Sequence, residues 1–377
     1  MKFELFLLEH WMNRYQFADP PIEFDIASST GPQWTLGELM NLLDEDERQR
    51  LFETKLVYTD GPGSRPLREA IAEMQGVSPE DILVLTGASE ALLALFFKAA
   101  QTGANVVLPF PSFPPFAEMP RSFGTETRFY RLRPENQFRI DTEEIKGLVD
   151  ANTKLILVNS PHNPTGATIS DDELTSLHEF ASERGVQLVV DEVYHPIYHG
   201  RETASASRLP SATVLGDFSK AFCLSGLRVG WMVERDRARM NEYLNARGYF
   251  TVSSAVINET LATHATRLRE TIFDKAREVA GKNLALLEKF FAEHSDALDW
   301  VRPQGGMTVF PCLRSGADAR SFCEGAAAEG VLLAPGDCFG MPAHFRLGFA
   351  ASGDRFSAAI ERLSDFVKKH SARVSAV

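Results

Sequence analysis

The sequence predicts an α/β protein: a large domain with three layers around a mainly parallel central sheet, and a smaller α+β domain beside it. The first observation is the length, because 377 residues exceed what one compact core usually supports. The second is that short apolar runs alternate with helical patterns from about residue 80, as parallel α/β sheets require. The third is that the last hundred or so residues change to short strands and amphipathic helices. We therefore predict a large domain over residues 45–270 and a small domain formed by residues 1–44 and 271–377.

The predicted elements follow from the apolar runs and from helix signals. In the large domain the expected strands are "ILVLT" (82–86), "NVVLP" (105–109), "KLILVNS" (154–160), "VQLVVDEVY" (186–194), "SATVLGDFSK" and "GLRVGWMV". One helix is expected over residues 87–100, and another opens with Ser170 and Glu173 at capping-box spacing and stops at Gly185. In the small domain "GGMTVFPCL" and "FRLGFAA" are expected strands, and "DARSFCEGAAAEG" and "DRFSAAIERLSDFVKKH" are expected helices.

Composition excludes several classes of protein. The formal net charge is -12 and no lysine or arginine block is present, which disfavours nucleic acid as a partner. The four cysteines have no metal-finger or redox-pair spacing, so we predict a reduced compartment and no metal site. Glu4 and Glu9 interrupt the apolar N-terminal run, no cleavage site follows, and no stretch is long enough to cross a bilayer. A cytoplasmic protein that does not bind membranes is expected.

Polar residues follow the predicted strands at the edge of the sheet where such folds bind ligands. Gly87, Ala88 and Ser89 lie where a strand gives way to a helix, and free amides, a hydroxyl and the helix dipole suit a phosphate there. A serine or glycine that merely caps the helix gives the same pattern. Neither this loop nor "GPGSRP" (61–66) matches a nucleotide-binding motif. Nucleotide ligands are therefore disfavoured.

Four further residues at this edge carry the chemical argument. Asp191 ends an apolar run, where a carboxylate needs a cation, either a protonated ring nitrogen or the partner of a structural salt bridge. Lys220 has apolar flanks, and a desolvated lysine is a nucleophile toward carbonyls, although a surface lysine is the alternative. Arg228 can pair with an acid or clamp a phosphate or carboxylate. Asn163 lies in a proline-fixed loop that orients its amide, or it is a turn asparagine.

Together these residues suit pyridoxal phosphate, which requires an amine, an acid for its ring nitrogen, donors for its ring oxygen and a phosphate cup. The sequence resembles the class I/II aminotransferases, which are fold type I pyridoxal-phosphate enzymes of the aspartate-aminotransferase superfamily. The matching segments run over nearly the whole chain in the family's order: "YTDGPGSRPLREAI", "LTGASEAL", "PSFPPF", "NSPHNPTG", "VVDEVY", "FSKAFCLSGLRVGW" and "FRLGF".

The resemblance implies a role for each matched residue. Lys220 would hold the cofactor as a Schiff base and move the substrate proton, and Asp191 would keep the ring nitrogen protonated. The other implied positions are Asn163 and Tyr194 at the ring oxygen, Phe113 against the ring, Ala88, Ser89, Ser219 and Arg228 at the phosphate, Tyr58 lent to the neighbouring subunit's phosphate, and Arg346, Asn163 and Gly31 at the substrate. Arg346 would bind the α-carboxylate. The role of Tyr58 implies a homodimer with the active site at its interface.

Asp217 departs from the family, which usually has Ser or Thr three residues before the lysine, with its hydroxyl on the phosphate. An ionised carboxylate there would repel the phosphate unless it points away or is paired with a cation. The departure puts that single contact in question and leaves the cofactor in place.

Transamination between an L-amino acid and a 2-oxo acid is the predicted activity, and two alternatives remain open. "PHNPTG" also occurs in C–S β-lyases of this fold. "LEHWMNRYQF", "DIASSTGPQWTLGEL" and "YTDGPGS" are similar to capreomycidine-synthase-like enzymes, which cyclise a hydroxylated arginine through β-elimination, whereas "DEVY" favours transamination. A cofactor-sensing regulator is the other alternative. It is disfavoured by the acidic balance and by motifs that begin by residue 58, which leave too little chain for a preceding DNA-binding domain.

Overall fold

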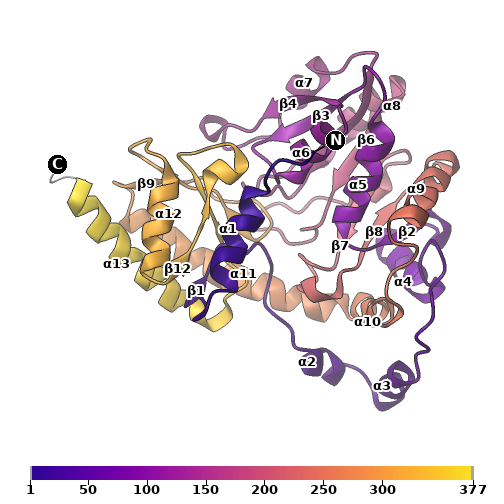
Figure 1. The fold of residues 1–377 in the computed structure, drawn as a ribbon, viewed down its shortest axis with the longest axis horizontal. Helices are drawn as coiled ribbons and strands as arrows, with labels where there is room; N and C mark the ends of the chain where they lie inside the picture. Colours follow the sequence, from indigo (N-terminus) through magenta and orange to yellow (C-terminus); the bar gives the residue numbers. More distant parts are fainter. Residues whose placement is uncertain (1, 375–377) are drawn as a thin grey trace.

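A seven-stranded sheet lies at the centre of the computed structural model, which describes residues 2–374 (Figure 1). The strands in spatial order are β2 (Ile82–Leu85), β8 (Gly230–Val233), β7 (Thr213–Asp217), β6 (Gln187–Asp191), β5 (Thr153–Asn159), β3 (Asn105–Phe110) and β4 (Glu126–Arg131). Only β8 runs antiparallel to its neighbours. The α/β class with a mainly parallel sheet is therefore confirmed.

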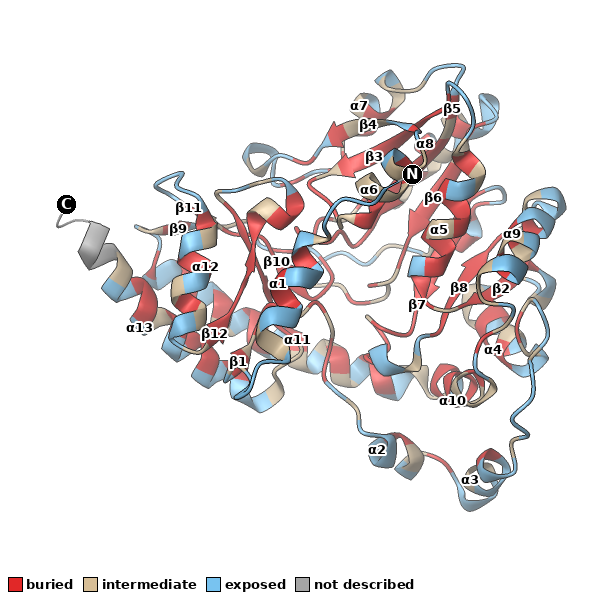
Figure 2. Cartoon of the chain, in the orientation of Figure 1, coloured by how far each residue is buried: buried red, intermediate tan, exposed pale blue. Residues whose placement is uncertain are grey.

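Helices cover both faces of this sheet, which gives the three predicted layers. Successive strand residues point to opposite faces, so Leu215 joins the core under α5, α6 and α9 while its neighbour Val214 joins the core on the other face. Figure 2 shows the strands buried and the helices exposed on their outer sides. The helices of this region are α4 (Arg65–Gln75), α5 (Ala88–Ala99), α6 (Pro115–Ser122), α7 (Thr142–Gly147), α8 (Asp171–Glu183), α9 (Arg237–Phe250) and α10 (Val256–Arg267).

The last third of the chain forms short sheets and helices beside the large sheet. Its elements are α11 (Arg269–Glu293), β9 (Leu298–Asp299), β10 (Thr308–Val309), β11 (Cys312–Leu313), α12 (Ala319–Ala328), β12 (Val331–Leu332), β13 (Ala334–Pro335), β14 (Phe345–Gly348) and α13 (Phe356–Val374). The N-terminal segment packs here, because β1 (Phe24–Asp25) pairs with β12 and the Trp11 indole donates to the Leu333 carbonyl at 2.8 Å. This pairing supports a small domain built from both ends of the chain, and its exact boundaries remain a prediction.

Between β1 and α4 the chain leaves the body of the molecule. It carries α2 (Leu36–Asn41) and α3 (Glu45–Phe52), which lie at the lower edge of Figure 1. Both helices start with a capping box, at Thr35 and Asp44. Large apolar side chains on this segment face solvent, namely those of Phe52, Leu56, Val57 and Tyr58.

The observed elements differ from the predicted ones at three informative places. β4 was not predicted, because its sequence "ETRFYR" carries three charged residues, which an edge strand tolerates. The strand expected over 186–194 ends at Asp191, whose Oδ1 accepts a hydrogen bond from the Val193 amide and turns the chain. The strand expected from "GLRVGWMV" starts only at Gly230, because Arg228 has a left-handed φ of 49°.

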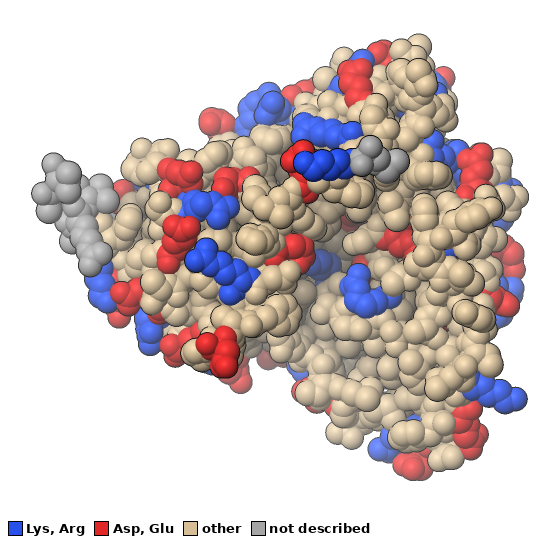
Figure 3. All heavy atoms as spheres, in the orientation of Figure 1, with Lys and Arg blue, Asp and Glu red and all other residues tan. Residues whose placement is uncertain are grey.

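The surface charges, the helices and the cysteines of the described residues bear on the predicted class of protein. Acidic and basic side chains are interspersed over the face drawn in Figure 3. No helix in residues 2–374 is long and apolar enough to cross a membrane. The same residues contain no His, Cys, Asp and Glu cluster of metal-site size, and the four cysteines are free thiols.

Candidate active site

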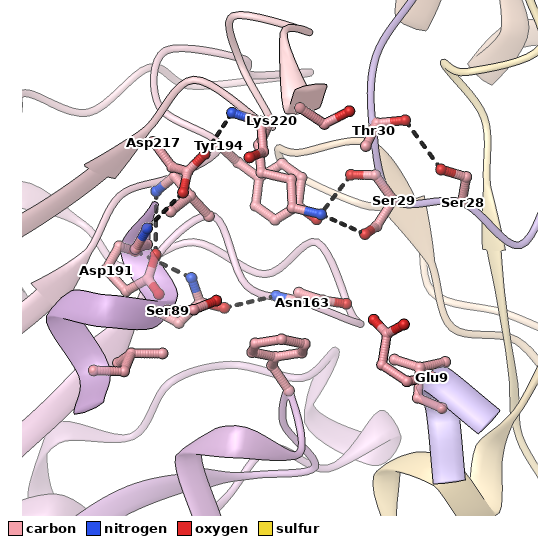
Figure 4. Close-up of a pocket in the computed structure, with 18 of the residues that line it drawn as sticks. Glu9, Ser28, Ser29, Thr30, Ser89, Asn163, Asp191, Tyr194, Asp217 and Lys220 are labelled. Carbon is pink, nitrogen blue, oxygen red and sulfur yellow. Dashed lines mark hydrogen bonds between the residues drawn. The ribbon is translucent and has the colours of Figure 1, made fainter. Parts of the chain in front are cut away.

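A cavity of about 370 Å³ opens at the carboxyl edge of the large sheet (Figure 4). One wall consists of residues that follow the strands, and the opposite wall consists of α1 (Leu7–Gln16) and residues 28–30. Ten of the residues predicted from the sequence line this cavity: Ala88, Ser89, Phe113, Asn163, Asp191, Tyr194, Ser219, Lys220, Arg228 and Arg346. The topology therefore brings together side chains spread over more than two hundred residues of sequence.

Lys220 follows β7 and points into the cavity. Its Nζ donates a hydrogen bond to the Ser29 hydroxyl at 2.8 Å, and the buried Tyr194 hydroxyl donates to the Ser29 carbonyl at 3.0 Å. The Lys220 Nζ lies 5.9 Å from the centre of the Tyr194 ring. Ser29 therefore joins the N-terminal wall to the amine and the phenol of the sheet wall.

Asp191 is the last residue of β6 and is only 4% exposed. Burial raises the pKa of its carboxyl to about 7, and the nearby Asp217 carboxylate adds to this shift, while the Val193 amide and Lys220 act against it. A cation next to Asp191 would lower this pKa again and would be attracted strongly. The cavity thus holds a buried acid without a full counter-charge.

Arg346, on β14, is held by backbone and side-chain acceptors at the other end of the cavity. Its Nη1 donates to Asn163 Oδ1 at 3.2 Å and its Nη2 donates to the Ala27 carbonyl at 2.9 Å. The backbone of Asn163 is itself held in place, because its backbone N–H donates to Asn159 Oδ1 at 2.8 Å. Arg346 is 3% exposed, burial lowers its pKa, and its Nε has no hydrogen-bond partner among the described residues. A carboxylate in the cavity would supply the missing acceptor.

The start of α5 forms the predicted phosphate end of the cavity, and Asp217 occupies part of it. Asp217 is buried, and its two oxygens accept hydrogen bonds from the Ala88 amide at 2.6 Å and the Ser219 amide at 2.5 Å. Arg228 makes no ion pair with this carboxylate in the described structure and instead donates from Nη1 to the Ser219 hydroxyl at 3.1 Å. The carboxylate thus points at the phosphate end and uses amides that a phosphate would otherwise bind.

Close backbone packing fixes this end of the cavity. A Cβ on Gly230 would lie 2.7 Å from the Ala88 nitrogen, so β8 can pass beneath the start of α5 only with glycine there. A Cβ on Gly87, which has a φ of 79°, would lie 2.6 Å from Arg228 Nη2. Because neither glycine has a side chain, the Ala88 amide and the Arg228 guanidinium can lie close together at this end of the cavity.

Two predicted site residues lie outside the cavity of this chain. The Tyr58 side chain is 84% exposed on the segment that leaves the body of the molecule. Gly31 is buried against Cys223, whose Sγ would lie 2.2 Å from a Cβ at that position, and it is not part of the cavity wall. The role of Tyr58 at a neighbouring subunit's cofactor therefore stays a prediction.

Sequence reasoning missed the N-terminal wall. Glu9, Gln16, Ser28, Ser29 and Thr30 line the cavity, yet none of them is predicted from the sequence as a site residue. The helical period of α1 indicates which of its faces is apolar, and it contains no information on which other element that face meets. These residues reach the cavity only because the N-terminal segment packs against the C-terminal part of the chain.

The comparisons with known proteins agree with this geometry. The family model described as "Aminotransferase class I and II" matches residues 33–363, which is most of the chain. The chain belongs to the class I and II aminotransferase family. Membership of this family, together with its pyridoxal-phosphate-dependent structural neighbours, means that the enzyme uses pyridoxal phosphate.

Individual relatives of this family member carry different names. Capreomycidine synthase of Streptomyces vinaceus is 29% identical over 96% of this chain and 94% of its own length. Aspartate aminotransferase of Bacillus subtilis is 28% identical over 83% of this chain and 84% of its own. A solved pyridoxal-phosphate-dependent aminotransferase from Streptococcus suis superposes with a TM-score of 0.90 at 28% identity, over 98% of this chain and 99% of that one.

The residues of the cavity fit the cofactor. The half-buried Lys220 supplies an amine, the buried Asp191 suits a protonated ring nitrogen, and Phe113 offers an aromatic face. Arg228 supplies a cation at the phosphate end. Asp217 is the one group that does not favour a phosphate dianion.

Proposed function

We propose that this enzyme is an aminotransferase that moves an amino group between an L-amino acid and a 2-oxo acid. The observation that carries the proposal is that the Lys220 amine, the buried Asp191 and the buried Arg346 guanidinium face one cavity. Pyridoxal phosphate, when bound, supplies an aldehyde that condenses with amines and a ring that withdraws electrons. The remaining work is binding, orientation and proton transfer by the chain itself.

Lys220 is proposed to hold the cofactor and then to act as the general base. Its amine reaches Ser29 at 2.8 Å, so it has a resting partner in the cavity when it is not bonded to the cofactor. From this position the neutral amine can accept the proton from the substrate Cα and return it at another carbon. Tyr194, held by the Ser29 carbonyl, is proposed to keep its phenol beside this amine.

Arg346 is proposed to hold the α-carboxylate of the substrate. Its Nη1 and Nη2 already have acceptors in Asn163 and Ala27, which fix the plane of the guanidinium, and its Nε is left without a partner. A carboxylate bound there would leave the substrate's amino group within the cavity that Lys220 also lines.

A homodimer is proposed as the functional unit. Phe52, Leu56, Val57 and Tyr58 expose large apolar surface on one segment, which is typical of a protein interface. Mixing a Lys220→Ala variant with a Tyr58→Phe variant tests this arrangement: recovery of cofactor affinity in the mixture supports shared sites, and purely additive behaviour of two monomers contradicts them.

A lyase or cyclase is the second candidate function. It is favoured by one observation, that capreomycidine synthase matches 96% of this chain, a larger share than the 83% matched by the Bacillus subtilis aspartate aminotransferase. Lys220 and Arg346 would serve either reaction, because elimination of a β-substituent also starts with removal of the Cα proton.

The experiment that separates the two candidates uses the holoenzyme and single L-amino acids without an acceptor. Transamination converts the cofactor to its pyridoxamine form, with loss of the visible band and release of one equivalent of 2-oxo acid. Repeated release of ammonia while the visible band persists would contradict transamination and support the lyase.

A further inference from the structure

We propose that Glu9 selects substrates whose side chain carries a positive charge, an ammonium or guanidinium at the end of an aliphatic chain. The inference rests on the proposed function in one respect, that an amino acid with its α-carboxylate on Arg346 is the substrate. It names the class of that amino acid.

Glu9 faces the cavity from α1. Figure 4 shows its carboxylate directed toward the cavity, on the side of Asn163. Leu8, Met12 and Gln16 line the cavity from the same helix, at spacings that place all four residues on one face. This face therefore offers a substrate an apolar surface from Leu8 and Met12 and acceptor groups from Glu9 and Gln16.

The three acids of the cavity differ in what they bind. Asp191 accepts the Val193 amide, and Asp217 accepts the amides of Ala88 and Ser219. Within residues 2–374 the Glu9 carboxylate has no hydrogen-bond or ion-pair partner, and its residue is exposed. Its charge acts on Arg346 across the cavity without a direct bond, so it can accept a substrate cation without breaking an existing hydrogen bond.

Gln16 lies about two turns farther along α1 than Glu9 and adds an acceptor at the other end of the same helix face. Its Nε2 donates to Asp25 Oδ2 at 2.7 Å, and Asp25 is fixed in turn because its Oδ1 accepts the amides of Ala27 and Ser28. This bond orients the Gln16 amide and leaves its oxygen for other donors. A guanidinium or ammonium has several N–H donors, so the Glu9 carboxylate can accept from it, and the Gln16 oxygen remains a separate acceptor farther along the wall.

Within one subunit, the described cavity wall offers no spare cation for a substrate with an acidic side chain. Lys220, Arg228 and Arg346 are the basic residues among those that line it, and each serves the cofactor or the α-carboxylate in the proposed function. No further cation of this described wall is left for an aspartate or glutamate side chain, and Glu9 would repel one. The wall that one subunit supplies thus favours a cationic over an anionic substrate side chain.

The test measures the rate at which separate L-amino acids change the absorbance of the holoenzyme's cofactor. Lysine, ornithine and arginine are expected to react with a higher second-order rate constant than norleucine, which has a similar chain without the charge. Glutamate is expected to react more slowly than norleucine. Equal rate constants for arginine and norleucine in the wild-type enzyme would overturn the inference.

Substitution of Glu9 separates recognition from a general electrostatic effect. Glu9→Gln is expected to lower the rate constant for the basic amino acids roughly tenfold, as for loss of one partly solvated ion pair, and to change that for norleucine less than about twofold. Glu9→Lys is expected to raise the rate constant for glutamate. Glu4→Gln is the matched control, because it removes the same charge from the same segment but lines a different cavity.

The outcomes distinguish this inference from the proposed function. An equal loss for all amino acids in Glu9→Gln would mean that Glu9 merely balances Arg346, and it would overturn the inference. Ammonia release in place of pyridoxamine formation would instead contradict transamination. The preference for basic amino acids and its loss in Glu9→Gln would still be measurable in that case, since the Cα proton is removed in both reactions.

Discussion

The polar side chains of the sheet wall and Glu9 of the N-terminal wall are held differently. On the sheet wall Asp191, Asp217 and Asn163 are buried, and backbone amides or fixed side chains bond them. On the N-terminal wall Glu9 is exposed and without a partner in the described structure. A reaction common to a family needs groups held to a fraction of an ångström, whereas a substrate preference can be set by a group that meets only the substrate.

The physical origin of this difference is the position of each residue in the fold. Strand ends are fixed by a sheet that is buried on both faces, so the residues that follow them inherit that rigidity. Helix α1 contacts the rest of the chain along its apolar side, through residues such as Trp11. Its polar side chains can be exchanged at little cost in stability.

The largest effect is expected from the sheet wall at Lys220. Lys220→Ala should abolish the visible cofactor band and lower the turnover of any substrate by at least about a thousandfold, because no other amine lines the cavity in the described structure. Absorbance with and without borohydride, together with circular dichroism to verify folding, measures this. An unchanged visible band in the variant would refute the assignment of Lys220.

The next effect concerns Arg346 of β14, which bonds to Asn163 on the sheet wall and to Ala27 in the N-terminal segment and is proposed to bind the substrate. Arg346→Lys should raise the KM for every amino acid by roughly a hundredfold with a smaller change in kcat, because a lysine keeps the charge but loses the fork that Asn163 and Ala27 orient. Steady-state kinetics measure both constants. If kcat falls while KM stays constant, Arg346 does not bind the α-carboxylate.

The buried Asp191 should make the stability of the apoprotein depend on pH, whereas the exposed Glu9 should not. Burial raises its pKa from 3.8 to about 7, so the folded apoprotein binds a proton that the unfolded chain has released, and stability falls as pH rises through this window. Asp191→Asn should therefore raise the Tm of the apoprotein by a few degrees above pH 7 and change it little near pH 4. Calorimetry of apoprotein across this range measures it, with Glu9→Gln as the control. A constant difference in Tm at all pH values would contradict the assigned cause.

Within the sheet wall, the Asp217 carboxylate should weaken the binding of a phosphate. Asp217→Ser should strengthen the binding of inorganic phosphate and of pyridoxal phosphate to the apoprotein by several-fold, because it removes a buried negative charge and releases the amides of Ala88 and Ser219. Fluorescence titration gives both dissociation constants. Weaker binding in Asp217→Ser would show that the carboxylate supports the phosphate site by ordering the two amides.

The smallest effect is expected where the two walls meet. Ser29→Ala removes the 2.8 Å bond to Lys220 and keeps the Ser29 carbonyl that binds Tyr194, so it should cost about 0.5 to 1.5 kcal/mol of stability in the apoprotein. Ser28→Ala is the control, since Ser28 bonds only to its neighbour Thr30 through its hydroxyl. Equal changes in the two variants would indicate that the Lys220 contact adds nothing.

The class of the fold, the order of its main elements and the chemistry of one cavity wall are predictable from local sequence patterns. Apolar runs of strand length are decided locally, and polar residues directly after such runs must meet at one edge of a parallel sheet. The sequence therefore predicts that Lys220, Asp191 and Asn163 share one site. Their individual roles come from the resemblance to the class I/II aminotransferases.

The composition of the N-terminal wall and the direction of the Asp217 side chain depend on long-range packing. Glu9 and Ser29 lie roughly two hundred residues from Lys220, and no periodicity states which surface α1 will cover. The side chain of Asp217 could have pointed away from the phosphate end, and its two amide bonds show that it does not. Long-range packing fixes both facts, because it depends on how the two ends of the chain close over the sheet.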